Sequence, residues 1–257
     1  MRNTALITGA SSGIGLELAK QFAQHGHDVV LTARNEQALQ QLKQELEKQY
    51  EVSVEVIALD LSAPNTAQVL FDTCRHKNLT ITYLVNNAGF GHFGLFAESN
   101  WEKQHQMIEL NITALTQLTH LFLPQLIQQK GKILNVASTA AFQPGPTMAV
   151  YYATKAFVLH FSEALSNELK PTGVTVTALC PGATESGFQK AAEMEESKLV
   201  KGRKLPSSAD VAIYGYKAFM NGKVVAIHGW LNYLMAQSIR FTPRSLVLKV
   251  VRFIQDK

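Results

Sequence analysis

Short apolar runs rich in valine, isoleucine and leucine alternate along this chain with longer segments in which apolar residues recur at helical spacing. Continuous apolar runs are typical of strands buried on both faces, and the longer segments suit helices that cross from one strand to the next. Strands are predicted near residues 4–8, 28–33, 52–59, 81–86, 131–137, 173–180 and 223–228. We therefore expect an α/β fold in which helices cover both faces of a doubly wound, parallel, seven-stranded sheet.

No low-complexity linker and no internal repeat divides the chain, so we expect one folded unit over residues 1–257. Within it, residues 183–206 are polar and charged and contain Gly187 and Gly202, a composition that suits a mobile flap over a substrate. Beyond the last predicted strand, apolar residues recur again at helical spacing. A C-terminal helical extension is therefore expected over residues 229–257.

The last helical segment of this extension is both apolar and basic. Thr242 and Pro243 suit an N-cap and a first-turn proline. Behind them, a wide apolar face is formed by Leu246, Val247, Val250, Val251 and Ile254. Lys249 and Arg252 lie opposite. Such a helix can close the core, join a second subunit or touch a membrane surface, and we favour packing or subunit contact over peripheral membrane contact.

Composition narrows the class of protein. A chain of 257 residues that is 46% hydrophobic and 17% charged is ordinary for one soluble α/β domain. The net charge of +4 comes from the tail, because residues 240–257 hold five basic side chains against the single acid Asp256. No broad basic surface is left for nucleic acid, which we therefore do not expect as a partner.

The cysteines and the first residues bear on the compartment. Cys74 and Cys180 have neither the spacing of a metal site nor that of a disulfide framework, so we expect no metal and a reducing cytoplasm. Residues 1–8 already read as a strand, so we expect no signal peptide.

Between the first strand and the first helix the chain reads Thr-Gly-Ala-Ser-Ser-Gly-Ile-Gly over residues 8–15. Glycines permit a tight turn and close approach to a pyrophosphate, and the N-terminus of the next helix directs free N–H groups at it. A plain glycine-rich connection is the alternative, but strand, glycines and helix in this order favour a dinucleotide site. The residues expected to contact the dinucleotide are Gly9, Ser11, Ser12, Gly13, Ile14 and Gly15.

The second strand ends in Ala33-Arg34-Asn35, and no acid follows the turn by about twenty residues, where it would grip the adenosine ribose of NAD. Arg34 instead places a guanidinium where a 2′-phosphate would lie, which favours NADP(H) over NAD(H). A surface arginine at a strand end is the alternative. After the third strand, Asp60 and Leu61 are candidates for the adenine pocket, and Asp60 could equally cap the following turn.

Polar residues after the fourth strand and within the next helix are two further groups of candidate functional residues. Asn87, Ala88 and Gly89 could let backbone pass close to a ribose, or could tie neighbouring strand ends together. Asn111 stands inside the apolar helical pattern of residues 101–129. We expect its amide to bond something specific, such as a water that links Lys155 to solvent, and a solvated side chain is the alternative.

The stretch from Ser138 to Lys155 carries the candidate chemistry. In a helix, Tyr151 and Lys155 share one face, so the ammonium can lower the pKa of the phenol toward neutrality. Tyr152 is a weaker candidate because Ala156 stands four residues after it. Ser138 follows an apolar run, so its hydroxyl would emerge at a strand end and could hold a carbonyl oxygen. Together these residues predict a proton-transfer site for a carbonyl.

In order and spacing, these motifs resemble the classical short-chain dehydrogenases/reductases over nearly the whole chain. The motifs are TGASSGIG at 8–15, NNAG at 86–89, Asn111, Ser138, YxxxK at 151–155 and Pro181-Gly182. The resemblance implies a Rossmann-like fold, a nicotinamide cofactor and a catalytic tetrad made of Asn111, Ser138, Tyr151 and Lys155. It also implies that Lys155 binds the nicotinamide ribose.

The same resemblance implies that Pro181 and Gly182 line the nicotinamide pocket, with Thr184 or Ser186 as the partner of the carboxamide. The tail is similar to that of an uncharacterised bacterial branch grouped with DltE-like proteins, which favours an apolar substrate.

We therefore predict an NADPH-dependent oxidoreductase that reduces a ketone or aldehyde and reversibly oxidises the alcohol. Its substrate is expected to be an apolar or acyl-type small molecule. The protein is expected to assemble as a homodimer or homotetramer. The alternative is a non-catalytic NADP(H)-binding sensor or scaffold, against which the intact tetrad argues. A sugar-nucleotide epimerase or dehydratase is disfavoured, because the chain lacks a substantial extra substrate domain.

Overall fold

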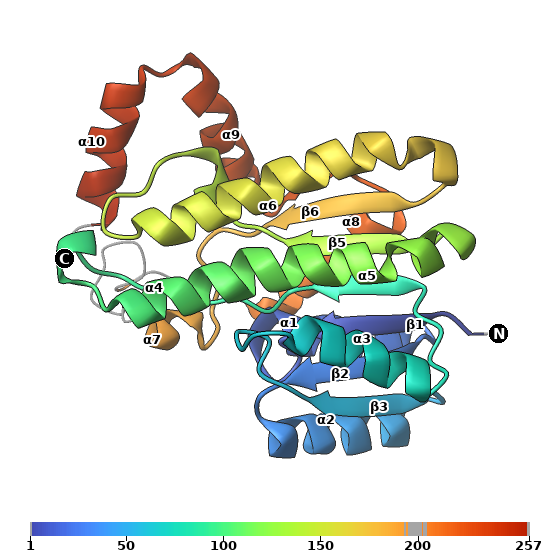
Figure 1. Cartoon of the computed structure of the whole chain (residues 1–257). Coiled ribbons are helices and arrows are strands. Elements are labelled where there is room, and N and C mark those ends of the chain that lie inside the picture. The colour runs from blue at the N-terminus through green and yellow to red at the C-terminus, as the bar shows by residue number, and fades with distance from the viewer. Residues whose placement is uncertain (1, 193, 195–201, 203–204, 256–257) are drawn as a thin grey trace.

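The computed structural model describes residues 2–192, 194, 202 and 205–255. All seven predicted strands are present, and each differs from its expected bounds by at most two residues at either end. They are β1 (Thr4–Thr8), β2 (Asp28–Ala33), β3 (Val54–Ala58), β4 (Tyr83–Asn86), β5 (Lys132–Val136), β6 (Thr175–Cys180) and β7 (Val225–Ile227). They form one sheet in the order β3-β2-β1-β4-β5-β6-β7, and every pair is parallel (Figure 1).

Helices connect the strands. They are α1 (Gly13–Gln24), α2 (Glu36–Gln49), α3 (Thr66–His76), α4 (Trp101–Ile108), α5 (Leu115–Gln128), α6 (Ala149–Glu168), α7 (Phe188–Ala191), α8 (Ser208–Met220), α9 (Trp230–Ser238) and α10 (Arg244–Gln255). Short 3-10 turns occupy Phe96–Glu98, Thr139–Phe142, Lys170–Thr172 and Ile239–Phe241. Among the described helices, none combines the length and the hydropathy that a membrane span requires.

The apolar core has two layers because successive strand residues point to opposite faces of the sheet. In β1, Ala5 and Ile7 pack in one cluster with α1, α2 and α8, whereas Leu6 packs in the other with α3, α5 and α6. All three β1 side chains are fully buried. The expected doubly wound α/β fold with helices on both faces is therefore confirmed.

The direction of winding reverses at β1, which pairs with β2 on one side and with β4 on the other. In open α/β sheets, the loops at the carboxyl ends of the strands diverge at such a point and leave a crevice for a ligand. The glycine-rich turn after Thr8 and the polar residues after Asn86 therefore meet at this crevice.

The helix predicted over residues 101–129 is interrupted. A π-helical segment over Glu109–Ala114 separates α4 from α5. One extra residue per turn rotates the side chains of this segment relative to the two flanking helices, and such segments frequently occur at functional sites. Asn111 lies in it.

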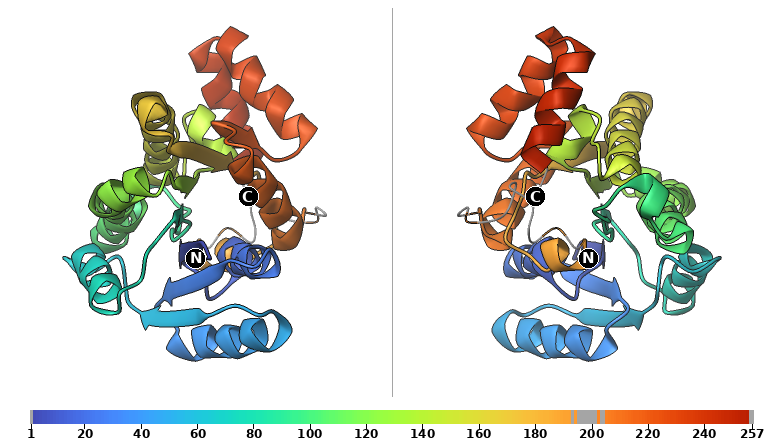
Figure 2. Two further views of the ribbon diagram at one scale, coloured as in Figure 1. Left: turned by 90° about the vertical axis from the view of Figure 1, so that its right-hand side faces the viewer. Right: turned by 90° about the vertical axis from the view of Figure 1, so that its left-hand side faces the viewer.

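The predicted C-terminal helical extension is also present. Helices α9 and α10, joined through the turn Ile239–Phe241, stand together as a hairpin at the end of the molecule opposite α2 (Figure 2). The predicted flap over residues 183–206 lies only partly within the described residues. Its described part includes the short helix α7, and its role as a flap stays a prediction.

Candidate active site

A cavity of about 430 Å³ lies at the crevice between the diverging strands. It is lined by the glycine turn, the ends of β2 to β6, the start of α6 and the segment around α7. The predicted site residues that line it are Gly9, Ser11, Ser12, Gly13, Ile14, Arg34, Asp60, Leu61, Asn87, Ala88, Gly89, Ser138, Tyr151, Lys155, Pro181, Gly182, Thr184 and Ser186. Gly15 and Asn111 lie outside this lining.

The glycine turn has the backbone that only glycine adopts readily. Gly9 has φ +67° and Gly13 has φ +56°. A Cβ on Gly9 would lie 2.9 Å from the Cα of Ala88, so the turn and the loop after β4 are in direct backbone contact. Gly15 serves this packing, because a Cβ there would lie 2.3 Å from the Asn87 amide nitrogen and from the Gly9 carbonyl oxygen. Its expected contact with a dinucleotide stays a prediction, beside this packing role.

Hydrogen bonds hold the two loops together. The Thr8 hydroxyl accepts from the backbone N–H groups of Asn87 and Ala88, both at 2.9 Å. The Asn87 side chain donates back to the carbonyl oxygens of Thr8 and Gly9, at 2.8 and 3.3 Å. The loop after β4 thus ties strand ends together, one of the two roles expected for it, and it also lines the cavity.

The first turn of α1 is left open for an anion. Within the described part of the chain, the N-cap residue Ser12 makes no side-chain capping bond, and the first turn holds no acidic residue. A helix N-terminus of this kind presents unpaired backbone N–H groups and the positive end of the helix dipole. The chain therefore fits a phosphate group at this end of the cavity.

Arg34 and Asp60 stand together at the far end of the cavity. The guanidinium Nη1 lies 4.0 Å from Asp60 Oδ2, and the Arg34 side chain is 79% exposed. Burial acts to raise the pKa of Asp60, but two hydrogen bonds from Ser62 and the charge of Arg34 outweigh it and hold that pKa below its usual value. Asp60 therefore caps its own turn, one of the two roles expected for it. The Arg34 guanidinium is mostly exposed and only loosely paired with Asp60, so it can reorient toward an anion.

The candidate proton donor lies at the start of α6. Tyr151 is 9% exposed, and Ser138 lines the same cavity as a hydrogen-bonding neighbour that acts to lower the pKa of the phenol. Ser138 follows β5, as expected, and its hydroxyl also accepts from the backbone N–H of Ala140 at 3.1 Å. The two hydroxyls predicted to work on a carbonyl therefore line one cavity, although thirteen positions separate them along the chain.

Lys155 lies one helical turn after Tyr151, also facing the cavity. Its ammonium nitrogen donates to the carbonyl oxygen of Val136 at 2.8 Å and lies 5.9 Å from the centre of the Tyr151 ring. Burial lowers the pKa of Lys155 to about 8, against a smaller opposing effect of Cys180. The ammonium can thus lose its proton within the ordinary working range of pH.

The sequence predicted that Lys155 lowers the pKa of Tyr151, and for the chain without a cofactor this prediction is wrong. Burial raises the pKa of Tyr151 to about 12, and only the hydrogen bond with Ser138 opposes that shift. The physical reason is that both groups leave water together, so the loss of phenolate solvation outweighs the attraction to an ammonium that is itself held by Val136. The phenol therefore stays protonated at neutral pH, the state that a proton donor needs.

Asn111 is buried, with 1% of its surface exposed, which excludes the solvated alternative. Its amide donates to the Phe90 carbonyl and to the Thr154 hydroxyl, each at 3.0 Å, and its oxygen accepts from the Phe90 N–H at 3.2 Å. A Cβ on Gly89 would lie 2.9 Å from the Asn111 oxygen and 3.5 Å from the Lys155 nitrogen. Asn111 and Lys155 therefore converge on one backbone position.

One side of the cavity is an apolar wall that the sequence motifs did not predict. It consists of Phe90, Leu110, Met148, Tyr152, Phe188 and Met194. Phe90 directly follows the NNAG motif and Tyr152 directly follows Tyr151, so adjacency to a motif was the available signal. Distant residues such as Phe188 join the wall only through the fold. Its ring centre lies 5.3 Å from that of Tyr151.

Known proteins resemble this chain in sequence and in structure. The sequence profile described as short chain dehydrogenase matches residues 3–197. A sulfoacetaldehyde reductase of Chromohalobacter salexigens is 39% identical over 194 residues, which cover 73% of this chain and 75% of that protein. A very-long-chain 3-oxoacyl-CoA reductase of Laccaria bicolor is 36% identical over 178 residues, which cover 68% of this chain and 53% of that protein.

A solved structure of a short-chain dehydrogenase from Sphingobium yanoikuyae in complex with NADPH shares 33% sequence identity and a TM-score of 0.82 with this chain. The match covers 93% of this chain and 94% of that one. These comparisons bear out the resemblance to the family but not the one to the DltE-like branch, which stays a prediction. By its profile match and its seven-stranded fold, this chain belongs to the short-chain dehydrogenase family of oxidoreductases.

Proposed function

We propose that the chain is an NADPH-dependent oxidoreductase that reduces a ketone or aldehyde and reversibly oxidises the corresponding alcohol. One observation carries this proposal. One cavity is lined both by the open N-terminus of α1 with the mostly exposed guanidinium of Arg34, and by Ser138, Tyr151 and Lys155. Anion binding and carbonyl chemistry are thus held in one space.

The residues that would hold the cofactor are those of the glycine turn, Arg34, the loop after β4, Lys155 and the loop after β6. Arg34 favours NADP(H) because a guanidinium suits a 2′-phosphate, and a relative of the same fold was solved with NADPH. For the carboxamide, Thr184 is favoured over Ser186, because Thr184 is nearly buried beside the Gly182 carbonyl, to which it donates at 2.9 Å. When bound, the cofactor supplies the hydride.

The chain's own residues handle the proton. Ser138 donates to the carbonyl oxygen and holds it beside Tyr151, whose phenol then gives its proton to that oxygen as negative charge develops. Lys155 holds the ribose and supplies positive charge beside the phenol. Asn111 acts as a positioning residue behind the cavity, because its side chain and the Lys155 ammonium both lie beside Gly89, which lines the cavity.

The apolar wall defined above favours an apolar or acyl-type substrate. The names of two relatives fit a carbonyl substrate, since one reduces sulfoacetaldehyde and the other a very-long-chain 3-oxoacyl-CoA. The wall residues offer dispersion contacts and no charged group, so a long apolar tail suits this space better than a sulfonate does.

We propose assembly as a homodimer or homotetramer, and peripheral membrane contact of the C-terminal helix is the other proposed partnership. Nucleic acid is not proposed as a partner. A cytoplasmic location, expected from the cysteines, stays a prediction.

The experiment is NADPH consumption by the parent chain and by Tyr151→Phe over a panel of ketones, 3-oxoacyl thioesters and sterols. The variant keeps the ring and removes the proton, so we expect its kcat to fall by on the order of a hundredfold or more while NADPH still binds. Tyr233→Phe, which removes an exposed phenol hydroxyl outside the cavity lining, is the matched control. A Tyr151→Phe variant as fast as the parent would remove the proposed role, and NADPH binding without turnover on any carbonyl would favour a sensor or scaffold.

A further inference from the structure

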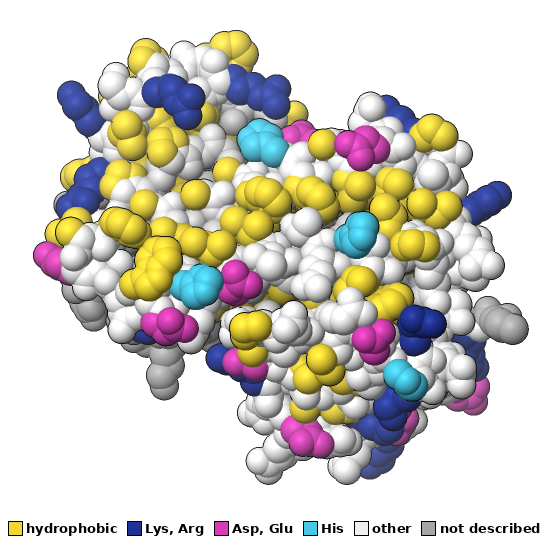
Figure 3. Space-filling view, in the orientation of Figure 1, with side chains coloured by type: hydrophobic (Ala, Val, Ile, Leu, Met, Phe, Trp, Pro, Cys, Tyr) yellow, Lys and Arg dark blue, Asp and Glu magenta, His cyan; other side chains and the backbone are white. Residues whose placement is uncertain are grey.

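The C-terminal hairpin presents a surface, called the hairpin surface here, that is apolar and basic at once. Its exposed large apolar residues are Trp230, Leu231, Tyr233, Leu234, Met235, Phe241, Leu246, Leu248, Val250 and Phe253. Its exposed basic residues are Arg240, Arg244, Lys249 and Arg252. In Figure 3, apolar and basic side chains gather at the upper left of the molecule, where Figure 1 places α9 and α10.

Core packing, favoured from the sequence, accounts for only one stripe of α10. Val247 and Val251 are buried against the cluster that contains Tyr151, so they anchor the helix beside the active site. The expected apolar face is wider than this stripe. Leu246, Val250 and Phe253 repeat at spacings of four and three, which sets them on a second flank of the helix that stays exposed.

Helix α9 is more exposed and more apolar than a helix that faces water normally is. It contains no charged residue between Trp230 and Ser238, and only Ala236 is buried. A solvated helix normally carries polar side chains on the face turned away from the core. An exposed apolar face of this breadth marks a contact site for another apolar phase or protein.

The hairpin tip combines one apolar wedge with two cations. Phe241 is 88% exposed in the turn between the helices, and Arg240 and Arg244 stand within three residues of it. Aromatic rings and arginine stems suit the boundary between acyl chains and headgroups, where the ring enters the apolar layer and the guanidinium stays with phosphate.

Charge decides which occupant suits the hairpin surface. No acidic residue occurs anywhere between residues 229 and 255, although four basic residues do. In a two-fold pair of chains the same patch contributes to both sides, so like charges would face one another. An anionic bilayer offers both the apolar phase and the opposite charge.

We propose that the hairpin surface docks on a bilayer that contains anionic phospholipid, with Phe241 inserted and the basic side chains at the headgroups. The docking is monotopic: the exposed apolar flanks of α9 and α10 lie at the level of the interface. The contact goes beyond the oxidoreductase activity and does not depend on it.

The test is co-sedimentation of the full chain with vesicles of phosphatidylcholine alone or with added phosphatidylglycerol. We expect binding to the vesicles that contain phosphatidylglycerol, and weaker binding as salt concentration rises. Phe241→Ser should weaken binding to them roughly tenfold, since one apolar anchor is lost. Arg240→Gln with Arg244→Gln should weaken it by on the order of tenfold or more, with little change on neutral vesicles.

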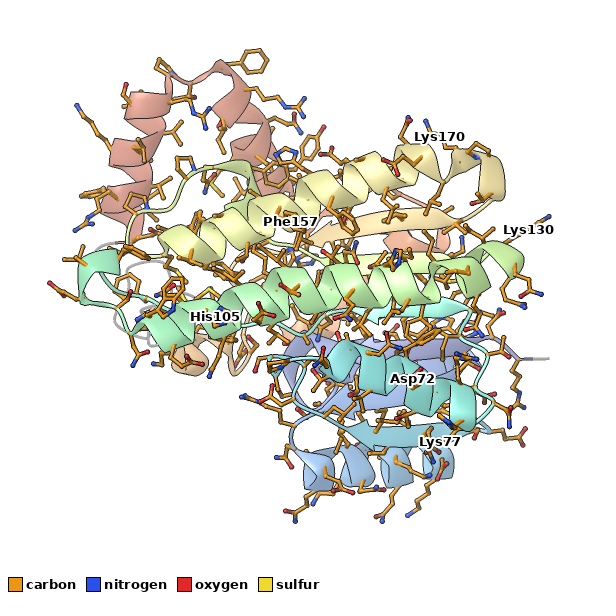
Figure 4. All side chains as sticks on the ribbon, in the orientation of Figure 1. Asp72, Lys77, His105, Lys130, Phe157 and Lys170 are labelled. Carbon is orange, nitrogen blue, oxygen red and sulfur yellow. The ribbon has the colours of Figure 1, made fainter. Side chains whose placement is uncertain are left out.

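Matched controls come from residues outside the hairpin surface. Trp101→Ser removes another exposed aromatic residue, and Lys130→Gln with Lys170→Gln removes two cations that lie far from the hairpin (Figure 4). Both controls should bind as the parent does, and circular dichroism should show all variants folded. Equal losses in the controls would overturn the proposal. The proposal would also be overturned if the parent failed to bind vesicles while Phe241→Ser halved the mass of its assembly. That result would show that a second copy of the chain covers the hairpin surface.

Discussion

The Gln255 side chain, near the end of α10, donates a hydrogen bond to the Tyr152 hydroxyl, 103 positions away in the sequence and next to the candidate proton donor. Both side chains are buried, with 1% of Gln255 and 7% of Tyr152 exposed. Gly145 lies against the Tyr152 ring, and a Cβ there would come within 2.3 Å of it. The C-terminal helix therefore fixes one wall residue of the cavity from behind.

Gln255→Leu is expected to destabilise the fold, because the Tyr152 hydroxyl would stay buried without this donor. The predicted loss in free energy of unfolding is about 1–3 kcal/mol. Urea denaturation measures it, with Gln128→Leu at the exposed end of α5 as control. Adding Tyr152→Phe to Gln255→Leu should recover part of the loss, since both polar partners are then gone. Additive losses in the double variant would show that the two side chains are not coupled.

Arg34→Ala is expected to change cofactor choice while leaving stability nearly intact. The side chain is 79% exposed and its ion pair with Asp60 is 4.0 Å long, so the pair contributes little to folding. The KM for NADPH should rise by roughly tenfold or more, because a charge-assisted contact is lost, while the KM for NADH stays the same. Steady-state kinetics with both cofactors decide this, with Arg75→Ala on α3 as control. An unchanged NADPH/NADH ratio would refute the role of Arg34.

The rate of carbonyl reduction is expected to fall as pH rises through about 8, the value to which burial lowers the pKa of Lys155. The sign follows from the charged form: Lys155 is protonated below this pH and neutral above it, so its support of Tyr151 and the ribose is present at low pH and lost at high pH. Tyr151, with its pKa raised to about 12, stays protonated throughout this window.

The pH profile of kcat/KM checks this expectation, with Lys155→Met beside the parent. The variant should be slow at every pH and should lack the fall near pH 8. A parent profile that is flat from neutral pH to pH 10 would contradict the titration of Lys155, whatever the rate of the variant.

Gly9→Ala is expected to disturb both folding and NADPH binding, because its new Cβ would meet Ala88 at 2.9 Å in a left-handed backbone. Gly26→Ala is a close control, since Gly26 has φ +76° but no atom within 4 Å of its added Cβ. The control should lose only the backbone preference, about 1 kcal/mol. Thermal unfolding and NADPH titration compare the two. Equal effects of the two substitutions would mean that the contact between the glycine turn and the loop after β4 contributes nothing to stability or to NADPH binding.

Much of the fold could be predicted because its signals are local. Each strand is a run of neighbouring apolar residues, and helix spacing alone sets Tyr151 and Lys155 on one face. The glycine turn is equally local, because its positive φ angles depend on residue type. The position of Ser138 at the end of β5 followed from the strand that precedes it.

What the sequence by itself determined is therefore the order of the elements, the turn and the residue types of the site. Only the tertiary structure decided the raised pKa of Tyr151, the partners of Asn111, the packing role of Gly15 and the exposure of the hairpin surface. The physical reason is common to all four. Desolvation, close backbone contact and exposure depend on segments that are distant along the chain. The local pattern of apolar and polar residues therefore cannot predict them.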